Sequence, residues 1–454
     1  MLYEKYIQSV EKKRTEIFGV SDGIWDHAEI AFHEFESSKI LSDALEKEGF
    51  TVERGICGIP TAFTAKYGKG HPAIGVLAEF DALSGLSQKA GITFPERAEG
   101  NDVGHGCGHN LFAGGSFAAV LAIKSYIEDT GNGSVTLFGC PAEEGGAGKV
   151  YLARAGIFQG IDSVVSWHPE KMYMVRTRPA LANLGYIYYF KGKAAHAGGS
   201  PEKGRSALDA LELMNVGCNF LREHMETTSR IHYAITDTGG TAANVVQAHA
   251  AVKYTVRATT LQDVMELHRR VDLVAKGAAM MTETTVESKF EAGYSSIILI
   301  PTLQQTVYEA MKDIPLPVPT QEDLDFARKI QETVEMSEEE RMAPPYAMEV
   351  LPPAPPVPHG GSTDTADVSW NTPTVQIHIG TWCKGTPGHS WQAVAQGKSH
   401  YAHEALLYAG KAVAGTAIRL MEHPELLEKA KSEHRNFTKS GYICPIPEDV
   451  LPPL

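Results

Sequence analysis

Two short glycine-rich strings in this chain hold residue types that bind metal ions. The first contains Cys107 and His109, and the second, a little further along the chain, contains Glu143 and Glu144. Cysteine and histidine suit zinc-like ions, and a carboxylate can bridge two ions or activate a water molecule. One acid of the pair could bind metal while its neighbour accepts a proton. Together the two strings predict metal-assisted hydrolysis.

Each string also has a purely structural explanation. Taken alone, Cys107 and His109 would more often be a buried thiol and a capping imidazole, and adjacent acids usually form a solvated turn. Neighbouring carboxylates repel each other unless a cation or a proton relieves the repulsion. Glu143 and Glu144 follow an apolar stretch and are flanked by proline and glycine. This context favours the mouth of an active site over a surface turn.

The elements that must position these residues alternate between strands and helices. After a helical N-terminal stretch, strands are expected at 63–67, 73–78, 134–139 and 163–167, and helices at 111–127 and 148–155. Such alternation indicates an α/β fold with a mixed, largely parallel sheet. Asp81, the acid pair and His168 all follow expected strands, and open α/β sheets bind ligands beyond the carboxyl ends of their strands. We therefore expect these side chains to gather at one edge of the sheet.

The pattern changes near residue 185. Residues 186–299 follow the order strand, helix, strand, strand, helix, strand, which is that of a ferredoxin-like α+β unit. The unit is inserted, because α/β material resumes with a helix near 301–312. The sequence therefore predicts a catalytic domain formed by residues 1–185 and 300–454, interrupted by a lid or dimerisation domain at 186–299.

The second part of the catalytic domain contains a proline-rich, acidic stretch at 315–361. We expect an excursion there with one helix near 321–335 and no folded domain. A strand at 374–380 and a long alanine-rich helix at 393–421 are expected to return the chain to the core.

Composition limits the classes of function. A chain of 454 residues with 43% apolar residues can bury a sizeable core. The net charge of −14 argues against nucleic-acid and anionic-membrane partners, which require basic patches. The six cysteines show no regular spacing, so a disulfide framework is not expected. Because the N-terminal residues run straight into a charged helical stretch, no signal peptide is expected, and no apolar run approaches the ~20 residues of a membrane span. These features predict a cytoplasmic protein.

Five further candidates have weak individual signals. His168 ends a strand, and His389 lies in a loop punctuated by glycine. His196, Asn244 and Arg257 belong to the inserted unit, where they could equally be a turn histidine, a turn cap and a residue that covers a sheet. They become stronger candidates because they occur in the same chain as the two glycine-rich strings.

The motifs on these residues resemble a family of dinuclear-metal peptidases that includes aminoacylases, carboxypeptidase G and bacterial amidohydrolases acting on N-acyl amino acids. The resemblance covers nearly the full length. Its motifs are Glu79-Phe80-Asp81-Ala82-Leu83, Gly106-Cys107-Gly108-His109-Asn110, Ala142-Glu143-Glu144, His168-Pro169 and His196-Ala197 with Pro201 and Gly204. The proline-rich excursion, residues 361–370 and Gly388-His389 look most like the amidohydrolase branch that cleaves p-aminobenzoyl-glutamate.

The resemblance implies two divalent metal ions per chain, zinc or manganese, with Cys107, His109, Glu144, His168 and His389 as the ligands. Glu143 would be the general base, and Asp81 an acid that orients the ligands. One departure is Glu79, where many relatives place a ligand histidine. The Cys-Gly-His string is expected to replace that ligand.

The expected reaction is hydrolysis of the amide bond of an N-acyl amino acid, with p-aminobenzoyl-glutamate as the best candidate. Glu143 would take a proton from the attacking water and return it to the leaving amine. His196 would donate to the oxyanion, and Arg257 or Asn244 would bind the substrate carboxylate, with Arg257 favoured for its bidentate geometry. We expect a homodimer through the lid, in which His196 of one chain completes the site of the other, and a related partner subunit is possible.

Three other interpretations stay open. A dipeptidase of similar build would cut β-alanyl or other short peptides. A cysteine hydrolase would use Cys107 as its nucleophile with His105 or His109, and would survive chelation. A non-catalytic dimer stabilised by metal would bind N-acyl amino acids without hydrolysing them.

Overall fold

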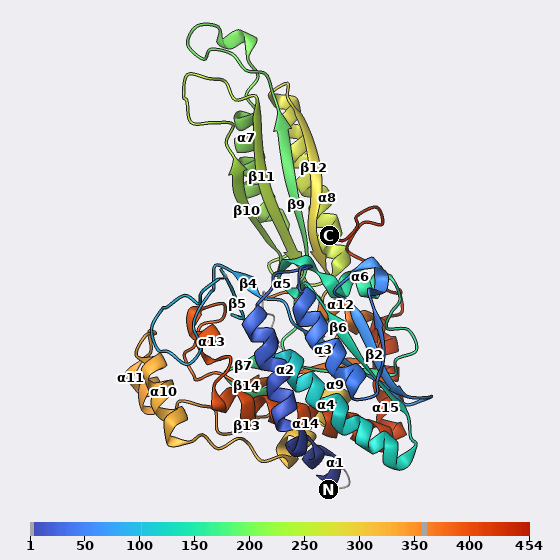
Figure 1. The fold of residues 1–454 in the computed structure, drawn as a ribbon. Helices are drawn as coiled ribbons and strands as arrows, with labels where there is room; N and C mark the ends of the chain where they lie inside the picture. The colour runs from blue at the N-terminus through green and yellow to red at the C-terminus, as the bar shows by residue number, and fades with distance from the viewer. Residues whose placement is uncertain (1–3, 101, 356–360) are drawn as a thin grey trace.

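The computed structural model describes residues 4–100, 102–355 and 361–454. Figure 1 shows a broad body and a narrow projection that rises from it. The body contains both the N-terminal part of the chain (blue) and the C-terminal part (red). Among the described residues, the body and the projection each have a hydrophobic core of their own. Segments from before and after the projection form the body, so the projection is an insertion.

An eight-stranded sheet forms the centre of the body. Its strands, in spatial order, are β1 (Thr51–Arg54), β2 (Phe63–Gly68), β6 (Ser134–Cys140), β3 (Ala73–Glu79), β7 (Ser163–Glu170), β14 (Thr374–Gly380), β8 (Tyr173–Val175) and β13 (Val350–Leu351). The central strands β6, β3, β7 and β14 are parallel, while β2 and β8 run antiparallel to their neighbours β6 and β14. The predicted mixed, largely parallel sheet is confirmed, and four carboxyl strand ends meet at one edge.

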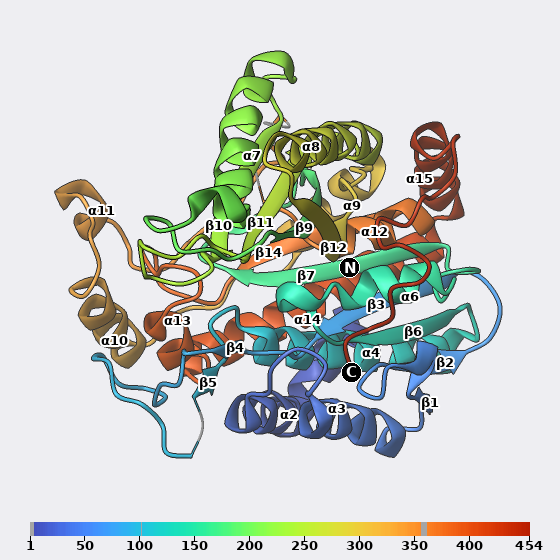
Figure 2. The ribbon, with the colours of Figure 1, turned by 90° about the horizontal axis from the view of Figure 1, so that it is seen from above.

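Helices pack against this sheet and shield its central strands, which are buried along their length (Figure 2). Helix α4 (His109–Thr130) lies against β3, β6 and β7, and α14 (His400–Glu422) packs along α4. The other helices of the body with six or more residues are α1 (Glu4–Ser9), α2 (Arg14–His27), α3 (Phe35–Lys47), α6 (Gly148–Arg154), α9 (Pro301–Asp313), α10 (Gln321–Gln331), α12 (Thr365–Asn371), α13 (Trp391–Gln396) and α15 (Pro424–Phe437).

Helix α4 is a long and strongly apolar helix. Its length and hydropathy match those of a membrane span, but 89% of its most apolar window is buried inside the protein. The close packing depends on glycine, because a Cβ on Gly115 would lie 2.5 Å from the ring of Trp167 on β7. We conclude that α4 is a core helix of the body.

The projection consists of a four-stranded antiparallel sheet with two helices on one face. Its elements are β9 (Ala182–Lys191), α7 (Ala207–Leu221), β10 (Arg230–Asp237), β11 (His249–Ala258), α8 (Leu261–Met281) and β12 (Thr285–Tyr294), and the sheet order is β10-β11-β9-β12. The chain order agrees with the predicted ferredoxin-like unit. This sheet spans Ala182–Tyr294 and so begins four residues before the predicted boundary. We propose 1–185, 186–299 and 300–454 as the approximate division of the chain.

The expected single helix at 393–421 is wrong. The structure has α13 and α14 there, separated by residues 397–399. Ser399 begins the second helix, because its side chain accepts the backbone N–H of Ala402 and satisfies a donor that would otherwise lack a partner.

The excursion at 315–361 has more structure than the single helix predicted for it. Besides α10, it contains the short helix α11 (Glu338–Met342), and β13 pairs in parallel with β8 at the edge of the main sheet. The excursion is therefore tied to the body. Its residues 356–360 lie outside the described part of the chain.

Candidate metal-binding active site

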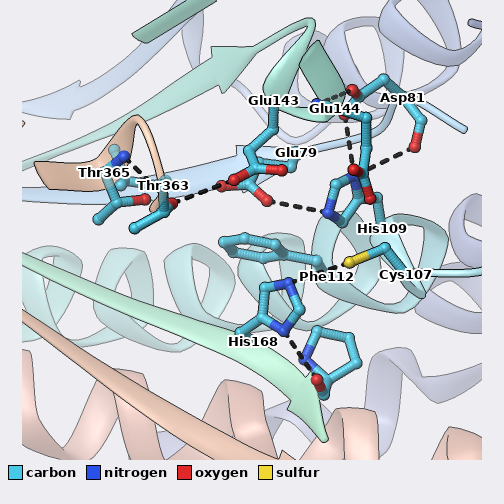
Figure 3. Close-up of polar contacts among 12 residues, drawn as sticks. Glu79, Asp81, Cys107, His109, Phe112, Glu143, Glu144, His168, Thr363 and Thr365 are labelled. Atoms are coloured by element: carbon cyan, nitrogen blue, oxygen red, sulfur yellow. Dashed lines mark hydrogen bonds and ion pairs between the residues drawn. The ribbon is translucent and has the colours of Figure 1, made fainter. Parts of the chain in front are cut away.

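The predicted site residues gather at the edge where the parallel strands end. Asp81 follows β3, the acid pair Glu143 and Glu144 follows β6, His168 lies in β7, and His109 is the first residue of α4. Figure 3 shows their side chains pointing toward one another from these separate elements. The topology of the sheet thus explains why residues from four segments meet.

Cys107 belongs to two groups of potential metal ligands. Its Sγ lies 3.4 Å from Nε2 of His168, and the ligand atoms of Cys107, His109 and His168 lie within 4.8 Å of one another. A second group, within the same limit, consists of Cys107, Glu144 and His389. The structure brings all five predicted ligands together, with Cys107 common to both groups.

Asp81 orients the ring of His109. Its Oδ1 lies 2.8 Å from Nδ1 of His109, and its Oδ2 accepts the backbone N–H of Glu144 at 2.8 Å. Because Asp81 engages Nδ1, the other ring nitrogen of His109, Nε2, is the one available to bind a metal ion. A single buried carboxylate thus holds both a candidate ligand and the loop that carries the acid pair.

Glu144 pairs with His389, which comes from a distant segment. His389 Nε2 lies 3.2 Å from Glu144 Oε1, and the His389 backbone N–H donates to the carbonyl of Gly106 at 3.2 Å. Burial acts to raise the pKa of Glu144, but the hydrogen bond from His389 and the positive charge of His109 outweigh burial and lower it to about 2. Glu144 is therefore an ionised carboxylate, the form that binds a cation.

Glu143 lies in a different environment from its neighbour. Burial raises the pKa of Glu143 well above its ordinary value, and the carboxylates of Glu79 and Asp364 raise it further. The hydroxyl of Thr363 donates to Oε1 of Glu143 at 3.1 Å. Adjacent acids with opposite pKa shifts can take separate roles, one holding a proton while the other stays ionised.

A strained turn presents the acid pair. Ala142 has a φ of 59°, in the left-handed region that residues other than glycine rarely adopt. Glu34 stabilises this turn by accepting the backbone N–H of Ala142 at 2.8 Å and that of Phe32 at 2.9 Å. Burial raises the pKa of Glu34 to about 8. No pattern in the sequence singled out Glu34, which comes from the loop before α3.

A buried ionic network, also missed from the sequence, lies beside the ligands. Lys149 Nζ lies 2.6 Å from Oε1 of Glu79 and 2.6 Å from Oδ1 of Asp364, and Asp364 Oδ2 also accepts the Lys149 backbone N–H at 2.9 Å. All three side chains are at most 1% exposed. Burial acts to lower the pKa of Lys149, but Asp364 and Glu79 outweigh it and raise the pKa, so the ammonium stays charged.

The sequence held only a partial signal for this network. Glu79 stood out because it replaces a histidine of many relatives, and Asp364 lies in a motif that we used only to assign the branch of the family. Nothing in the sequence marked Lys149 as a site residue, and only its place in a short expected helix with apolar neighbours could be noted. Its partners are visible only in three dimensions.

The residues present fit a divalent metal ion. Three buried polar atoms of the cluster have only ion-pair contacts within the described chain: Glu79 Oε2 lies 3.1 Å from His109 Nε2, and Glu144 Oε1 lies 3.2 Å from His389 Nε2. Such atoms are costly to bury, and a cation would satisfy them. Burial also raises the pKa of the Cys107 thiol, so a thiolate there requires a nearby positive charge.

His196 and Asn244 lie away from this cluster within their own chain. β9 runs from the body to the far end of the projection (Figure 1), and His196 lies five residues beyond its last residue, Lys191. The Ala197 backbone N–H donates to the carbonyl of Asn244 at 2.9 Å, so both candidates share this end. Nδ1 of His196 accepts the N–H groups of Gly198 and Gly199 at 3.1 and 3.0 Å, which leaves the proton on the exposed side chain's Nε2.

Arg257 lies at the opposite end of the projection, near the body. Its Nη1 donates to the hydroxyl of Ser362 at 2.8 Å, and Ser362 precedes the Thr363 that contacts Glu143. The structure therefore separates the two predicted carboxylate-binding residues. Arg257 lies next to the cluster of its own chain, whereas Asn244 lies at the far end of the projection with His196.

Comparisons with known proteins agree with this architecture. The model of the peptidase dimerisation domain matches residues 182–279, which are most of the projection. The chain is 41% identical to one of the subunits of the p-aminobenzoyl-glutamate hydrolase of Escherichia coli (strain K12), covering 99% of this chain and 98% of the relative. It is 27% identical to the Xaa-Arg dipeptidase of Mus musculus, covering 96% and 92% of the two chains.

A solved structure has the same fold. A dinuclear metal-binding peptidase of the M20 family from Bacillus subtilis superposes with a TM-score of 0.60 at 17% identity, covering 91% of this chain and 99% of the other. At that identity the likeness concerns the fold, while the Escherichia coli relative, matched over nearly its whole length, shows the family. The chain therefore belongs to the M20 family of dinuclear-metal peptidases, and within it to the metal-dependent amidohydrolases.

Proposed function

We propose that this amidohydrolase cleaves the amide bond of N-acyl amino acids, with p-aminobenzoyl-glutamate as the preferred substrate. The substrate is supported by the 41% identity to a subunit of the hydrolase named for that compound. The observation that carries the chemistry is the pair of three-residue ligand groups that share Cys107, next to a glutamate with a raised pKa.

The two ligand groups support two divalent ions per chain. Thiolate and imidazole ligands favour zinc, and carboxylate ligands also suit manganese. When bound, such ions polarise a scissile carbonyl and lower the pKa of water from about 15.7 toward about 7. Elemental analysis of the purified protein would identify the native metal.

Glu143 is the proposed general base. Its carboxylate takes the proton of the attacking water and returns it to the leaving amine. Thr363 holds one carboxylate oxygen through its hydroxyl, which fixes the direction of the other. Asp81 does not touch the substrate in this scheme, because its two oxygens are occupied by His109 and the Glu144 backbone.

His196 is the proposed oxyanion donor, acting from a partner chain. Its Nε2 carries a proton in the tautomer that the Gly198 and Gly199 N–H groups select. Asn244 lies at the same end of the projection as His196 and would reach the partner's site together with it. Arg257, by contrast, would bind the α-carboxylate of a substrate in its own chain's site.

The proposed assembly is a homodimer through the projection, as the match to a dimerisation domain suggests. β10 is an edge strand of its sheet, with Tyr233 42% and Ile235 43% exposed, and α7 exposes Phe220 to 70%. An edge strand beside exposed apolar side chains is a natural contact for a second chain. The Escherichia coli relative is named as one subunit of its hydrolase, which also supports a partner subunit. The proposed location is the cytoplasm, a reducing compartment that suits six free cysteines.

A dipeptidase is the second candidate, favoured by the 27% identity to an Xaa-Arg dipeptidase. The cysteine-hydrolase alternative is less compatible with the structure, because burial raises the pKa of the Cys107 thiol and no attacking thiolate is expected without a cation. A non-catalytic binding protein is disfavoured by the family, because the relatives named above are hydrolases.

The decisive experiment is chelation followed by reloading. The purified protein, assayed on p-aminobenzoyl-glutamate and on a set of dipeptides, should lose activity with chelator and regain it with zinc or manganese. Faster turnover of the aroyl-glutamate supports the proposal, and faster turnover of dipeptides would replace it with the second candidate. Activity that persists in a metal-free preparation would instead indicate a thiol nucleophile.

A further inference from the structure

The proline-rich excursion has no part in the proposed reaction, but it contacts the loop that carries one of the candidate ligands. His389 lies between β14 and α13, and α10 and α11 of the excursion lie beside α13 in both views of the fold (Figure 1 and Figure 2). We call residues 381–390 the ligand loop. The excursion therefore lies where it could control the position of a metal ligand.

The ligand loop does little to fix His389 by itself. The side chain of His389 is 55% exposed, and its backbone has a φ of 52°, in the left-handed region that residues other than glycine rarely adopt. The two residues before it, Pro387 and Gly388, are exposed as well. A strained backbone keeps its conformation when the surrounding structure over-determines it, so this loop needs support from other segments.

The excursion holds the ligand loop at Lys384, five residues before His389. The Lys384 backbone N–H donates to the carbonyl of Pro345 at 2.7 Å. The Lys384 carbonyl accepts a hydrogen bond from Nε2 of Gln331 at 3.0 Å. Both backbone polar groups of Lys384 are therefore bonded to the excursion.

A second contact holds the chain on the other side of His389. Nε2 of Gln392, three residues after His389, donates to the hydroxyl of Thr333 at 3.2 Å. Between these two positions the excursion also packs closely on the loop, because a Cβ on Gly385 would lie 2.7 Å from the sulfur of Met336. The excursion thus contacts the chain both before and after the candidate ligand.

Gln331 is the buried centre of these contacts. It is the last residue of α10 and is 2% exposed. Its Oε1 accepts a hydrogen bond from Nη1 of Arg328 at 3.0 Å. A guanidinium only donates and a carbonyl only accepts, so the amide oxygen must face Arg328 and the amide nitrogen must face Lys384. The orientation of this amide is therefore fixed by its two partners.

The excursion can support the loop because it is itself fixed to the body. The buried ring of Tyr346 stacks on Tyr401 of α14, with the ring centroids 3.7 Å apart. Asp323 of α10 lies 2.9 Å from Nδ1 of His400, the first residue of α14. α14 packs along α4, which begins with the candidate ligand His109. The excursion and the metal-ligand cluster therefore rest on the same pair of helices.

We propose that the excursion is a brace for the ligand loop and that Gln331 is a positioning residue, which holds His389 at the metal site. Gln331 acts on His389 through the backbone of Lys384. The proposal rests on the function proposed above, in which His389 is a metal ligand. Partners that orient a ligand typically contribute about ten- to a hundredfold to metal affinity.

The test is a titration of metal-free protein with cobalt, whose visible absorption reports the coordination of each bound ion, in competition with a chelator. Gln331→Met keeps the length of the side chain and removes the donor to Lys384. It should weaken one of two binding steps by roughly ten- to a hundredfold and leave the other near wild type. Gln331→Glu keeps an acceptor for Arg328 but also lacks the donor, and should do the same. His389→Ala, the reference, should weaken that same step more strongly.

Gln304→Met is the matched control. Nε2 of Gln304 also donates to a backbone carbonyl at 3.0 Å, but this carbonyl belongs to Arg176, in the segment after β8. The variant loses the same kind of hydrogen bond without any contact to the ligand loop. It should leave both cobalt-binding steps and both absorption spectra unchanged.

Thr333→Val is a second variant, for the case in which the Gln331 variants fold poorly. Thr333 is exposed, so the protein should tolerate the change, and the variant loses the acceptor for Gln392. It should weaken the same binding step by roughly two- to tenfold, the size expected for one neutral hydrogen bond. Urea unfolding of each variant shows that the titrations are carried out on folded protein.

The outcomes separate this inference from the proposed function. If His389→Ala leaves both binding steps unchanged, His389 is not a ligand and the brace has nothing to position. If His389→Ala weakens one step but Gln331→Met and Thr333→Val do not, or if they weaken both steps equally, the ligand assignment stands and the brace is wrong. A wild type that binds two ions but does not hydrolyse p-aminobenzoyl-glutamate would overturn the proposed substrate and leave the brace intact, because the titration does not depend on turnover.

Discussion

At the scale of the residue, the adjacent acids Glu143 and Glu144 show how position alone divides chemistry between identical side chains. Glu144 faces His389 and His109, and its pKa is lowered to about 2. Glu143 faces Thr363 and the buried carboxylates, and its pKa is raised. One carboxylate is therefore suited to bind a cation and the other to exchange a proton.

This division predicts different effects for the two isosteric substitutions. Glu143→Gln should lower kcat by at least about a hundredfold while metal content stays near wild type, because only the proton acceptor is lost. Glu144→Gln should lower metal content as well. Elemental analysis and steady-state kinetics on both variants check this, and the reverse pattern would show that the roles are exchanged.

The shared position of Cys107 leads to a second prediction. Because Cys107 and His109 each belong to two of the groups of potential ligands, Cys107→Ala and His109→Ala should each lose metal and activity together. Wild type at saturation should hold about two ions per chain. Equilibrium dialysis measures the number of bound ions, and a Cys107→Ala protein with full metal content and normal turnover would refute the ligand assignment.

At the scale of the element, helix α4 supports the geometry of the site by packing against the strands that carry the site residues. It begins with His109 and passes so close to β7 that a Cβ on Gly115 would overlap the ring of Trp167, the residue before His168. Gly108, which precedes the helix, has a φ of 74°, a conformation that glycine adopts without strain. A single helix thus supplies one ligand and supports the strand of another.

Gly115→Ala should therefore disturb both stability and metal binding. Its Cβ would lie 2.5 Å from Trp167, and relieving that overlap should cost about 1–3 kcal/mol of unfolding free energy. Urea unfolding followed by circular dichroism measures the change, and metal titration should show a weaker site because the Trp167 ring pushes on β7.

Gly19→Ala is the control for this prediction. Gly19 lies in α2 and has nothing within 4 Å of its Cβ position. Its replacement should stabilise the protein by about 0.5–1 kcal/mol through helix propensity. If both alanine variants changed stability in the same direction and by the same amount, close packing of α4 would not explain the glycine at 115.

At the scale of the whole molecule, the projection separates residues that the proposed reaction needs together. β9 has ten residues and so is about 33 Å long at ~3.3 Å per residue. His196 lies beyond its far end, whereas the ligand groups lie in the body (Figure 1). A second chain could bring His196 to the site, which is the reason for expecting a shared active site.

Complementation between two inactive variants tests this arrangement. In a hybrid dimer of His196→Ala and Glu143→Gln, the first chain keeps its base and receives an intact His196 from the second, so one of two sites should work. Random pairing makes half of the dimers hybrid, and roughly a quarter of wild-type activity should return. Mass spectrometry confirms that hybrids form, and hybrids without activity would mean that His196 does not act across the interface.

The sequence by itself determined the mixed α/β fold and the inserted unit, and the motifs that resemble the peptidase family suggested the five candidate ligands. These depend on local patterns: strands followed at once by polar residues, and Cys107 and His109 in one short string. Because parallel strands end at the same edge, the local pattern was enough to predict that Glu143 and His168 meet.

Only the tertiary structure decided which side chains touch. Lys149, Glu79 and Asp364 come from three segments, and a buried lysine has no local signature that names its partners. The separation of Arg257 from Asn244 follows from the direction of β11, and the pairing of His168 with His378 follows from strand register. Register and long-range packing depend on the complementarity of surfaces far apart in the chain, and residue types and their spacing do not encode that complementarity in a form that can be read locally.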